Sequence, residues 1–249
     1  MKDIKIEVCA GSYEDCLAAA RGKADRVELN SALALGGLSP TEGTLRLVKR
    51  DTDLKVICMV RPRGAGFHYT EVERKVMMAE AKSFLENGAD GIAFGFLNAD
   101  GTIDVEATKE MIDLIHSYNK EAVFHRAVDV TPDFEEAFRI LVELKADRVL
   151  TSGQEEKAMQ GKDQIKKMQE LFGDQIELLA GSGMNATNAM EMINETGIHQ
   201  IHSSCKGYDN DPTTSGEKVT YSYLAGEHAN DYDVVKEELV AKLMAAIGR

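Results

Sequence analysis

Short runs of apolar and β-branched residues alternate with longer amphipathic segments along the whole chain. Short apolar runs bounded by turn residues indicate buried strands, and apolar residues at three- and four-residue spacing indicate helices. The expected strands are 4–9, 26–30, 56–60, 91–96, 122–126, 148–151, 176–180 and 200–203. The expected helices are 13–21, 41–49, 71–86, 105–116, 134–144, 156–172, 187–193 and 234–247.

This alternation predicts an α/β protein built as a single (β/α)8 TIM barrel. Eight strand–helix units in a chain of 249 residues match the usual size of that fold. A doubly wound open sheet shows the same alternation and is the alternative. No composition shift divides the chain, so one domain spanning residues 1–249 is expected.

An internal repeat favours the closed barrel over the open sheet. Lys23-Ala24-Asp25, Gly88-Ala89-Asp90 and Lys145-Ala146-Asp147 introduce the second, fourth and sixth expected strands, and Gly197-Ile198-His199 is a weaker fourth copy. A unit of two strand–helix pairs that recurs four times closes a ring naturally. The small residue before each aspartate is expected to permit a tight turn from helix to strand.

Local signals place several helix starts and one irregular segment. Ser39 and Thr131, each followed by proline, are expected N-caps, and Thr70 with Glu73 predicts a capping box. Residues 206–233 break the alternation, being polar with little apolar periodicity. A loop of this length in a compact domain is typically a lid, a contact surface or a disordered segment.

Charge and composition exclude several classes of partner. The formal net charge of −13 repels nucleic acids and anionic membranes, so neither is expected as a partner. The apolar runs are too short to span a membrane, and the first residues lack a signal-peptide core. The four cysteines show no paired spacing, which is typical of a reducing compartment and predicts a cytoplasmic protein.

Polar residues are expected to gather at the mouth of the barrel, where the carboxyl ends of the strands meet. TIM barrels place their ligand sites there. Because side chains alternate along a strand, Glu7 and Cys9 should point inward from the first strand. The polar and glycine positions expected at this end are Glu7, Cys9, Glu28, Asn30, Arg61, Arg63, His125, Arg126, Ser152, Ser182, Gly183, His202, Ser203 and Cys205.

This set of residues has two general interpretations. In the first, Arg61 and Arg126 neutralise Glu7 and Glu28 in a buried structural network, and function resides in contacts between copies of the chain. In the second, the mouth binds a small phosphorylated or carboxylated ligand. The anion-binding residues would be Arg61, Arg63, Arg126, Ser152, Ser182, Gly183, His202 and Ser203, of which Ser182, Gly183 and Ser203 occupy the usual phosphate corner of such barrels.

The second interpretation assigns acid and base roles to Glu7, Glu28 and His125. A glutamate beside an arginine should be ionised, because the opposite charge lowers its pKa, and it would therefore serve as a base. His125 would be the proton donor if a nearby carboxylate keeps it protonated.

A metal site is a third possibility at the same place. A hard divalent ion would use Glu7, Glu28 and a histidine, whereas Cu(I) requires soft sulfur ligands. Cys9 and Cys205 become neighbours if the barrel closes and would form a two-thiol pair. Cys16 and Cys58 fall on helix-facing positions, where packing is expected.

The mouth segments resemble those of the CutC family, which is named for copper homeostasis. The resembling stretches are 7–9, 24–29, 36–40, 60–64, 90–95, 124–127, 148–153 and 180–183. The resemblance implies a TIM-type barrel, a cytoplasmic location, homo-oligomers with a dimer favoured, and a role in copper handling. It implies no established reaction.

One position departs from the family pattern. Members proposed to bind Cu(I) carry cysteines that match Cys9 and Asn30, and an asparagine is a poor ligand for a soft monovalent ion. Two functional hypotheses follow. The chain is a cytoplasmic copper homeostasis protein that binds Cu(I) through Cys9 and Cys205, or it is a TIM-barrel enzyme acting on a small phosphorylated or carboxylated metabolite.

Overall fold

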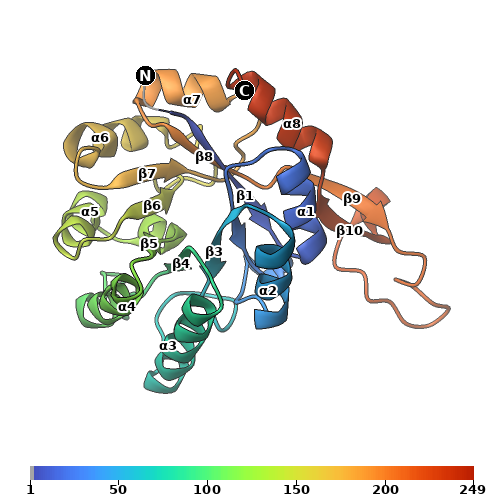
Figure 1. Cartoon of the computed structure of the whole chain (residues 1–249), viewed down its shortest axis with the longest axis horizontal. Coiled ribbons are helices and arrows are strands. Elements are labelled where there is room, and N and C mark those ends of the chain that lie inside the picture. Colours follow the sequence, from blue (N-terminus) through green and yellow to red (C-terminus); the bar gives the residue numbers. More distant parts are fainter. Residues whose placement is uncertain (1–2) are drawn as a thin grey trace.

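Eight parallel strands close into a barrel in sequence order (Figure 1). The structure, a computed structural model, describes residues 3–249. The ring is closed by pairing of the first strand with the eighth, in the register Glu7 opposite His202, which confirms the TIM barrel and excludes the open sheet. The strands are β1 Lys5–Ala10, β2 Arg26–Leu29, β3 Lys55–Met59, β4 Gly91–Phe94, β5 Glu121–Phe124, β6 Arg148–Thr151, β7 Glu177–Ala180 and β8 Gln200–Ser203.

Helices surround the barrel on its outside (Figure 1). No helix of the described chain is long and apolar enough to cross a membrane. Four helices start later than expected. The shifts at α2 and α7 are of one and two residues, whereas α6 starts later because residues 156–161 form turns, and α8 because Val234 and Val235 belong to a strand. The helices are α1 Tyr13–Arg21, α2 Glu42–Asp51, α3 Glu71–Glu86, α4 Val105–Ser117, α5 Phe134–Glu143, α6 Lys162–Phe172, α7 Ala189–Thr196 and α8 Glu237–Ala246, with 3-10 turns η1 Leu33–Leu35, η2 Arg126–Val130 and η3 Gly226–His228.

The inside of the barrel is divided between apolar and polar side chains. Outward-facing strand residues, Cys58 among them, pack with Cys16 and the helices in one large apolar cluster, as expected for both cysteines. Inside, a small separate cluster lies on β3, β4 and β5 and comprises Ile57, Met59, Ala93 and Val123. The buried inward residues of the other strands include the apolar Leu150 and Leu179 but are mostly polar, comprising Glu7, Arg26, Glu28, Arg148, Gln200 and His202.

The helix caps are partly as expected. The capping box of Thr70 and Glu73 at the start of α3 is confirmed. The caps predicted at Ser39 and Thr131 are wrong, because the residue after each proline serves instead. Thr41 accepts a hydrogen bond from the Thr44 N–H at 3.1 Å, and Asp133 accepts one from the Glu136 N–H at 2.9 Å.

The repeated aspartates join neighbouring strands at the amino end of the barrel. Each carboxylate accepts a hydrogen bond from a backbone N–H at the start of the preceding strand, and each aspartate N–H donates to the carbonyl of that same residue. The repeat therefore fixes the register of successive strand pairs. The pairs are Asp25 with Ile6, Asp90 with Val56, and Asp147 with Ala122.

The turn that leads into each repeat differs in detail from the expectation. In each repeated triplet the first residue adopts the left-handed conformation. The small residue before the aspartate does not. This position has φ of 66° at Lys23, 94° at Gly88, 65° at Lys145 and 78° at Gly197. Two of the four copies therefore place a lysine where glycine is favoured.

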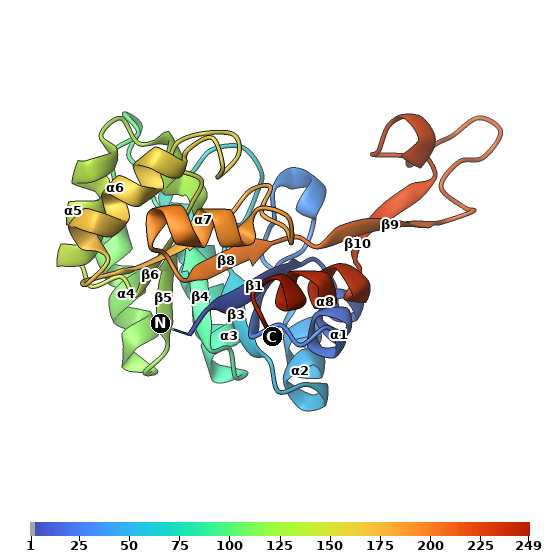
Figure 2. The same cartoon turned by 90° about the horizontal axis from the view of Figure 1, so that it is seen from above.

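Residues 206–233 contain the long loop that was expected, but two strands that the sequence did not predict flank it. β9 (Lys206–Asn210) pairs antiparallel with β10 (Asp231–Val235), and the hairpin projects well away from the barrel (Figure 2). Its base is held by Asp15 of α1, whose Oδ1 accepts a hydrogen bond from the Val235 N–H at 2.7 Å. Most strand residues of this hairpin are exposed or half-buried on both faces. Its strands therefore lack the apolar alternation of a strand with one buried face.

Candidate functional site

A buried chain of ionic contacts crosses the barrel where the first and last strands meet. Arg26 Nε donates to the Glu7 carboxylate, and His202 Nδ1 contacts Glu7 Oε1 at 2.8 Å. Arg26 Nη2 also donates to Gln200 Oε1 at 2.5 Å. A buried ion-pair network is therefore present, as the first interpretation expected, but its cations are Arg26 and His202 and not Arg61 or Arg126.

This network fixes the charges of Glu7 and His202. Burial opposes ionisation of Glu7, but the charge of Arg26 and the His202 hydrogen bond outweigh it and hold the pKa of Glu7 below its usual value. Burial also disfavours protonated His202, yet its hydrogen bonds with Cys9 and Glu7 outweigh that cost and raise the pKa of His202 well above its usual value. In the metal-free protein Glu7 is thus a carboxylate and His202 an imidazolium.

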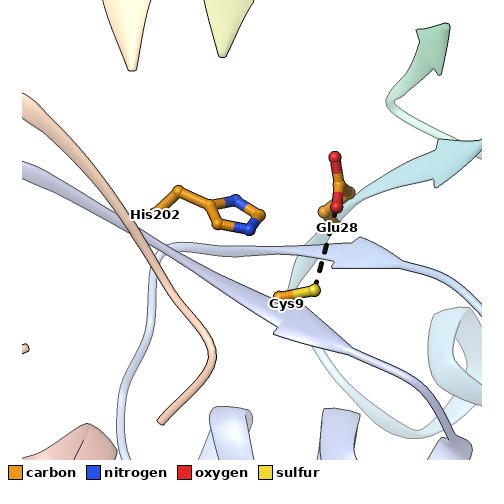
Figure 3. A group of neighbouring side chains, drawn as sticks. All are labelled: Cys9, Glu28 and His202. Atoms are coloured by element: carbon orange, nitrogen blue, oxygen red, sulfur yellow. Dashed lines mark hydrogen bonds between the residues drawn. The ribbon is translucent and has the colours of Figure 1, made fainter. Parts of the chain in front are cut away.

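Next to this network, three possible metal ligands converge at the mouth, and we call them the Cys-Glu-His cluster (Figure 3). It consists of Cys9 from β1, Glu28 from β2 and His202 from β8, which are neighbouring strands. One ligand atom from each lies within 4.8 Å of the other two. Because Nδ1 of His202 is engaged by Glu7, Nε2 is the nitrogen available to the cluster.

Asn30 positions two members of the Cys-Glu-His cluster. Its Nδ2 donates to Glu28 Oε2 at 3.0 Å and contacts Cys9 Sγ at 3.6 Å. Burial raises the pKa of the Cys9 thiol and also that of the Glu28 carboxyl, so burial favours their protonated forms in the metal-free protein. A metal ion would have to displace these protons and also the Nε2 proton of the His202 imidazolium, which makes binding dependent on pH.

A small cavity of about 140 Å³, the mouth cavity, lies beside the cluster. Arg61 lines it, and its Nη1 and Nη2 atoms donate to the backbone carbonyls of Leu35, Gly37 and Ala65. The guanidinium thereby joins the loops that follow β2 and β3. The residues that line the cavity are Cys9, Glu28, Gly36, Met59, Arg61, Phe67, His125, Arg126, Leu150 and His202.

His125 lies in the mouth cavity in a different state from the one expected. Burial and the nearby charge of Arg61 lower the pKa of His125 to about 3, so its imidazole is neutral at physiological pH. In residues 3–249 no carboxylate forms an ion pair with it. The condition for His125 to act as a proton donor is therefore not met, and His202 is the histidine that carboxylates keep protonated.

The remaining predicted anion ligands are divided among several places. Arg63 lies outside the mouth cavity, where it pairs with Glu73 at 2.5 Å. Arg126 lines the cavity and binds Asp129 at 2.9 Å and Ser152 Oγ at 2.6 Å. Ser182 Oγ donates to the Glu156 carbonyl at 2.6 Å.

A second hollow of about 450 Å³, the corner cavity, follows β7 and β8. Gly183, Ser203 and Cys205 line it together with Lys206 and Lys242. Ser203 Oγ donates to the Met184 carbonyl at 2.7 Å. The structure therefore separates the predicted phosphate corner from the arginines of the mouth.

Cys205 lies outside the Cys-Glu-His cluster. Its backbone has φ of 41°, and its Sγ lies 3.5 Å from Ser203 Oγ in the corner cavity. The ligand cluster found in the described residues includes Cys9 but not Cys205.

Two functional residues were missed by sequence reasoning. Arg26 orients Glu7, and Gln200 accepts a hydrogen bond from Arg26; both occupy inward positions at strand starts. Arg26 has the same parity as Glu28 along β2, so the alternation contained a signal for it. Gln200 carried no distinctive signal.

Comparison with known proteins agrees with the resemblance in sequence. The family model described as CutC family matches residues 4–207, and the match ends where the projecting hairpin begins. A family protein CutC from Treponema denticola is 49% identical, and the alignment covers 89% of each chain. Another, from Bacteroides thetaiotaomicron, is 40% identical and covers 83% of this chain and 82% of its own.

Solved structures give the same result. A CutC protein from Streptococcus agalactiae, whose name proposes a role in copper homeostasis, is 30% identical with a TM-score of 0.76, covering 81% of this chain and 98% of its own. A phosphoribosyl anthranilate isomerase from Thermococcus kodakaraensis is 14% identical with a TM-score of 0.55 over 99% of both chains, and shares the fold alone. The family match and the sequence identities establish that this chain belongs to the CutC family.

Proposed function

We propose that this protein binds one transition-metal ion at the Cys-Glu-His cluster. The observation that carries the proposal is the convergence of a thiol, a carboxylate and an imidazole within 4.8 Å. The contact between His202 and Glu7 supports it, because metal-binding histidines usually donate their second ring N–H to a carboxylate. Arg26 in turn holds Glu7, so the imidazole is oriented before a metal arrives.

The donor set distinguishes between ions. Zn²⁺ accepts one sulfur, one oxygen and one nitrogen ligand in a tetrahedral site whose fourth position is left for water or a substrate. Cu(I) prefers soft ligands, so it would use Cys9 Sγ and His202 Nε2 and leave Glu28 aside. We propose this two-ligand arrangement for any copper-handling role, in place of a Cys9–Cys205 pair.

A reducing cytoplasm suits this site. The four cysteines are free in the structure, and Cys9 must stay reduced to serve as a ligand. We therefore propose that the protein acts in the cytoplasm, where its metal supply would be Zn²⁺ or Cu(I).

Metal titrations of variants test the proposal. Metal-free protein would be titrated anaerobically with Zn²⁺, and separately with Cu(I) buffered by a chromophoric chelator. Both ions should bind once per chain, and Cys9→Ser should weaken both by about 100-fold or more. Glu28→Gln should weaken Zn²⁺ binding by about tenfold or more and change Cu(I) binding by less than about threefold.

Cys205→Ser is the matched control for loss of a buried thiol. It should leave both affinities unchanged, because Cys205 lies in the corner cavity. Equal metal binding by the wild type and Cys9→Ser would contradict the site. A loss of Cu(I) binding in Cys205→Ser equal to that in Cys9→Ser would restore the two-thiol pair instead.

A further inference from the structure

The mouth cavity contains two buried polar groups whose hydrogen-bonding capacity is unused. The side chains of Arg61 and His125 are 7% and 3% exposed, and both line the cavity. Arg61 Nε and His125 Nε2 have no hydrogen-bond partner within the described chain. Buried polar atoms without partners are rare in native proteins, and each one requires an explanation.

Arg61 is a buried cation that no carboxylate neutralises. Its Nη atoms are held by backbone carbonyls, and residues 3–249 offer no ion pair to it. Buried arginines are usually paired, because an isolated charge is costly to remove from water. The Tyr69 hydroxyl also approaches Arg61, but it is uncharged, so an anion on the side of Nε would supply the missing counter-charge.

The hydrogen bond at His125 Nδ1 fixes the tautomer of the ring. Nδ1 accepts a hydrogen bond from the Ala127 N–H at 3.2 Å, since His125 caps η2. The ring is neutral, because burial and Arg61 lower the pKa of His125 to about 3. Its single proton must therefore be on Nε2, so Nε2–H is a hydrogen-bond donor without an acceptor.

We propose that the mouth cavity binds a small carboxylate whose oxygens accept hydrogen bonds from Arg61 Nε and His125 Nε2. A cavity of about 140 Å³ is close to the engineered cavity of about 150 Å³ that holds benzene, so the ligand has about six non-hydrogen atoms. Met59, Phe67 and Leu150 supply apolar walls for its short carbon body. This inference goes beyond the metal site and requires no metal.

The same observations favour a carboxylate over a phosphate. A carboxylate presents two oxygens to two unpaired donors, whereas a phosphate would bring further acceptor oxygens that these two donors cannot satisfy. In a phosphorylated ligand of about six non-hydrogen atoms, the phosphate group would take five of them and leave almost no carbon body to cover the apolar walls. Of the two ligand classes expected from the sequence, the cavity thus selects the carboxylated one.

Calorimetry on chelator-treated protein tests the inference without interference from the metal site. L-lactate is the probe, lactamide is an uncharged molecule of the same size, and inorganic phosphate is the competing anion class. Lactate should bind saturably once per chain, and lactamide should bind at least about tenfold more weakly, because a charged hydrogen bond is lost.

Two substitutions of His125 form a matched pair. His125→Asn keeps an acceptor near the Ala127 N–H but removes the Nε2 donor, and it should weaken lactate binding by about tenfold or more. His125→Gln places a donor near the Nε2 position and should retain more of the affinity. Circular dichroism and the metal titrations described above would show that both variants fold, since neither alters a ligand of the Cys-Glu-His cluster.

Several outcomes would overturn the inference. Absence of saturable lactate binding would mean that the two donors are satisfied by water alone. Equal affinity in the wild type and His125→Asn would remove His125 from the site, and tighter binding of phosphate than of lactate would reject the carboxylate class. Because the measurement uses metal-free protein, none of these results would bear on whether Cys9 and His202 bind a metal.

Discussion

His202 Nδ1 lies 2.8 Å from Glu7 Oε1, across the seam where β8 closes onto β1. The contact joins residues near the two ends of the chain, and it forms only because the barrel closes. It turns Nε2 of the imidazole toward Cys9 and Glu28. One carboxylate thus contributes both to the closure of the fold and to the orientation of a proposed metal ligand.

Glu7→Gln should be strongly destabilising. The substitution leaves Arg26 buried without a counter-charge, and breaking a buried ion pair in this way costs about 3–5 kcal/mol of the free energy of unfolding. Urea denaturation of the metal-free protein measures the change. Glu42→Gln is the matched control, because its ion pair with Arg46 is largely exposed and should contribute less than about 1 kcal/mol. A loss in Glu7→Gln no larger than the control's would argue against the network.

Stability should fall on acidification because of His125. Its pKa is lowered from 6.5 to about 3 in the folded state, so below pH 6.5 the unfolded chain binds a proton that the folded chain does not. Stability therefore decreases as pH falls from 6.5 toward 3, by about 1.5 kcal/mol between pH 6.5 and about pH 5. Above pH 6.5 this contribution is constant.

His125→Asn provides the comparison for that pH dependence. Other groups, including Glu28 with its raised pKa, also contribute to the pH dependence, so the quantity to measure is the difference in slope between wild type and variant. His202 also gains its proton in the unfolded chain near pH 6.5, but it does so in both proteins and therefore cancels in this difference. Parallel stability curves for the two proteins would show that His125 is not buried in its neutral form.

Lys23→Gly and Lys145→Gly should each stabilise the protein. Both lysines adopt left-handed φ angles near 65°, where glycine avoids a steric cost, and we expect a gain of about 0.5–1 kcal/mol each. Gly88→Ala is the reciprocal control at the equivalent position and should be destabilising by a similar amount. An added Cβ there has room, with Lys49 Cγ at 3.8 Å, so the cost would be purely one of backbone conformation. The measurement is the thermal unfolding of the three variants, and a loss of stability in both glycine variants would contradict the prediction.

Asn30→Cys should raise the affinity for Cu(I). The Asn30 amide lies 3.6 Å from Cys9 Sγ, so a cysteine there would place a second thiol beside the first. Two thiolates suit Cu(I) better than one thiolate and an imidazole, and we expect a gain of about tenfold or more in competition with the chelator. Asn30→Ser removes the amide without adding sulfur and should show no gain. Equal affinities of the Cys and Ser variants would contradict the geometry of the cluster.

The sequence predicts the framework of this protein better than its chemistry. Alternation along β1 and β2 correctly places Glu7, Cys9 and Glu28 inside the barrel, and the repeat around Asp25, Asp90 and Asp147 correctly favours closure, because both signals depend on local periodicity. The two strands of the projecting hairpin, β9 and β10, were missed because hydrophobic periodicity indicates burial, and most of their residues are exposed or half-buried.

The roles of individual side chains were less accessible from sequence. His125 and His202 follow strands in much the same way, and only their neighbours in space make one neutral and the other charged. Cys205 lies beside Ser203 in the corner cavity, outside the Cys-Glu-His cluster. Both outcomes depend on contacts between residues far apart in sequence, and hydrophobic periodicity along the chain does not predict such contacts.

The aspartate repeat has a consequence for how such a protein can diversify. It secures strand alignment at the amino end of the barrel through bonds between carboxylates and backbone, which do not depend on what the opposite rim carries. Substitutions around Asn30 or His125 can therefore exchange one ligand preference for another while the scaffold keeps its shape. Homologues with different residues at the rim could evolve separate chemistries on the same foundation.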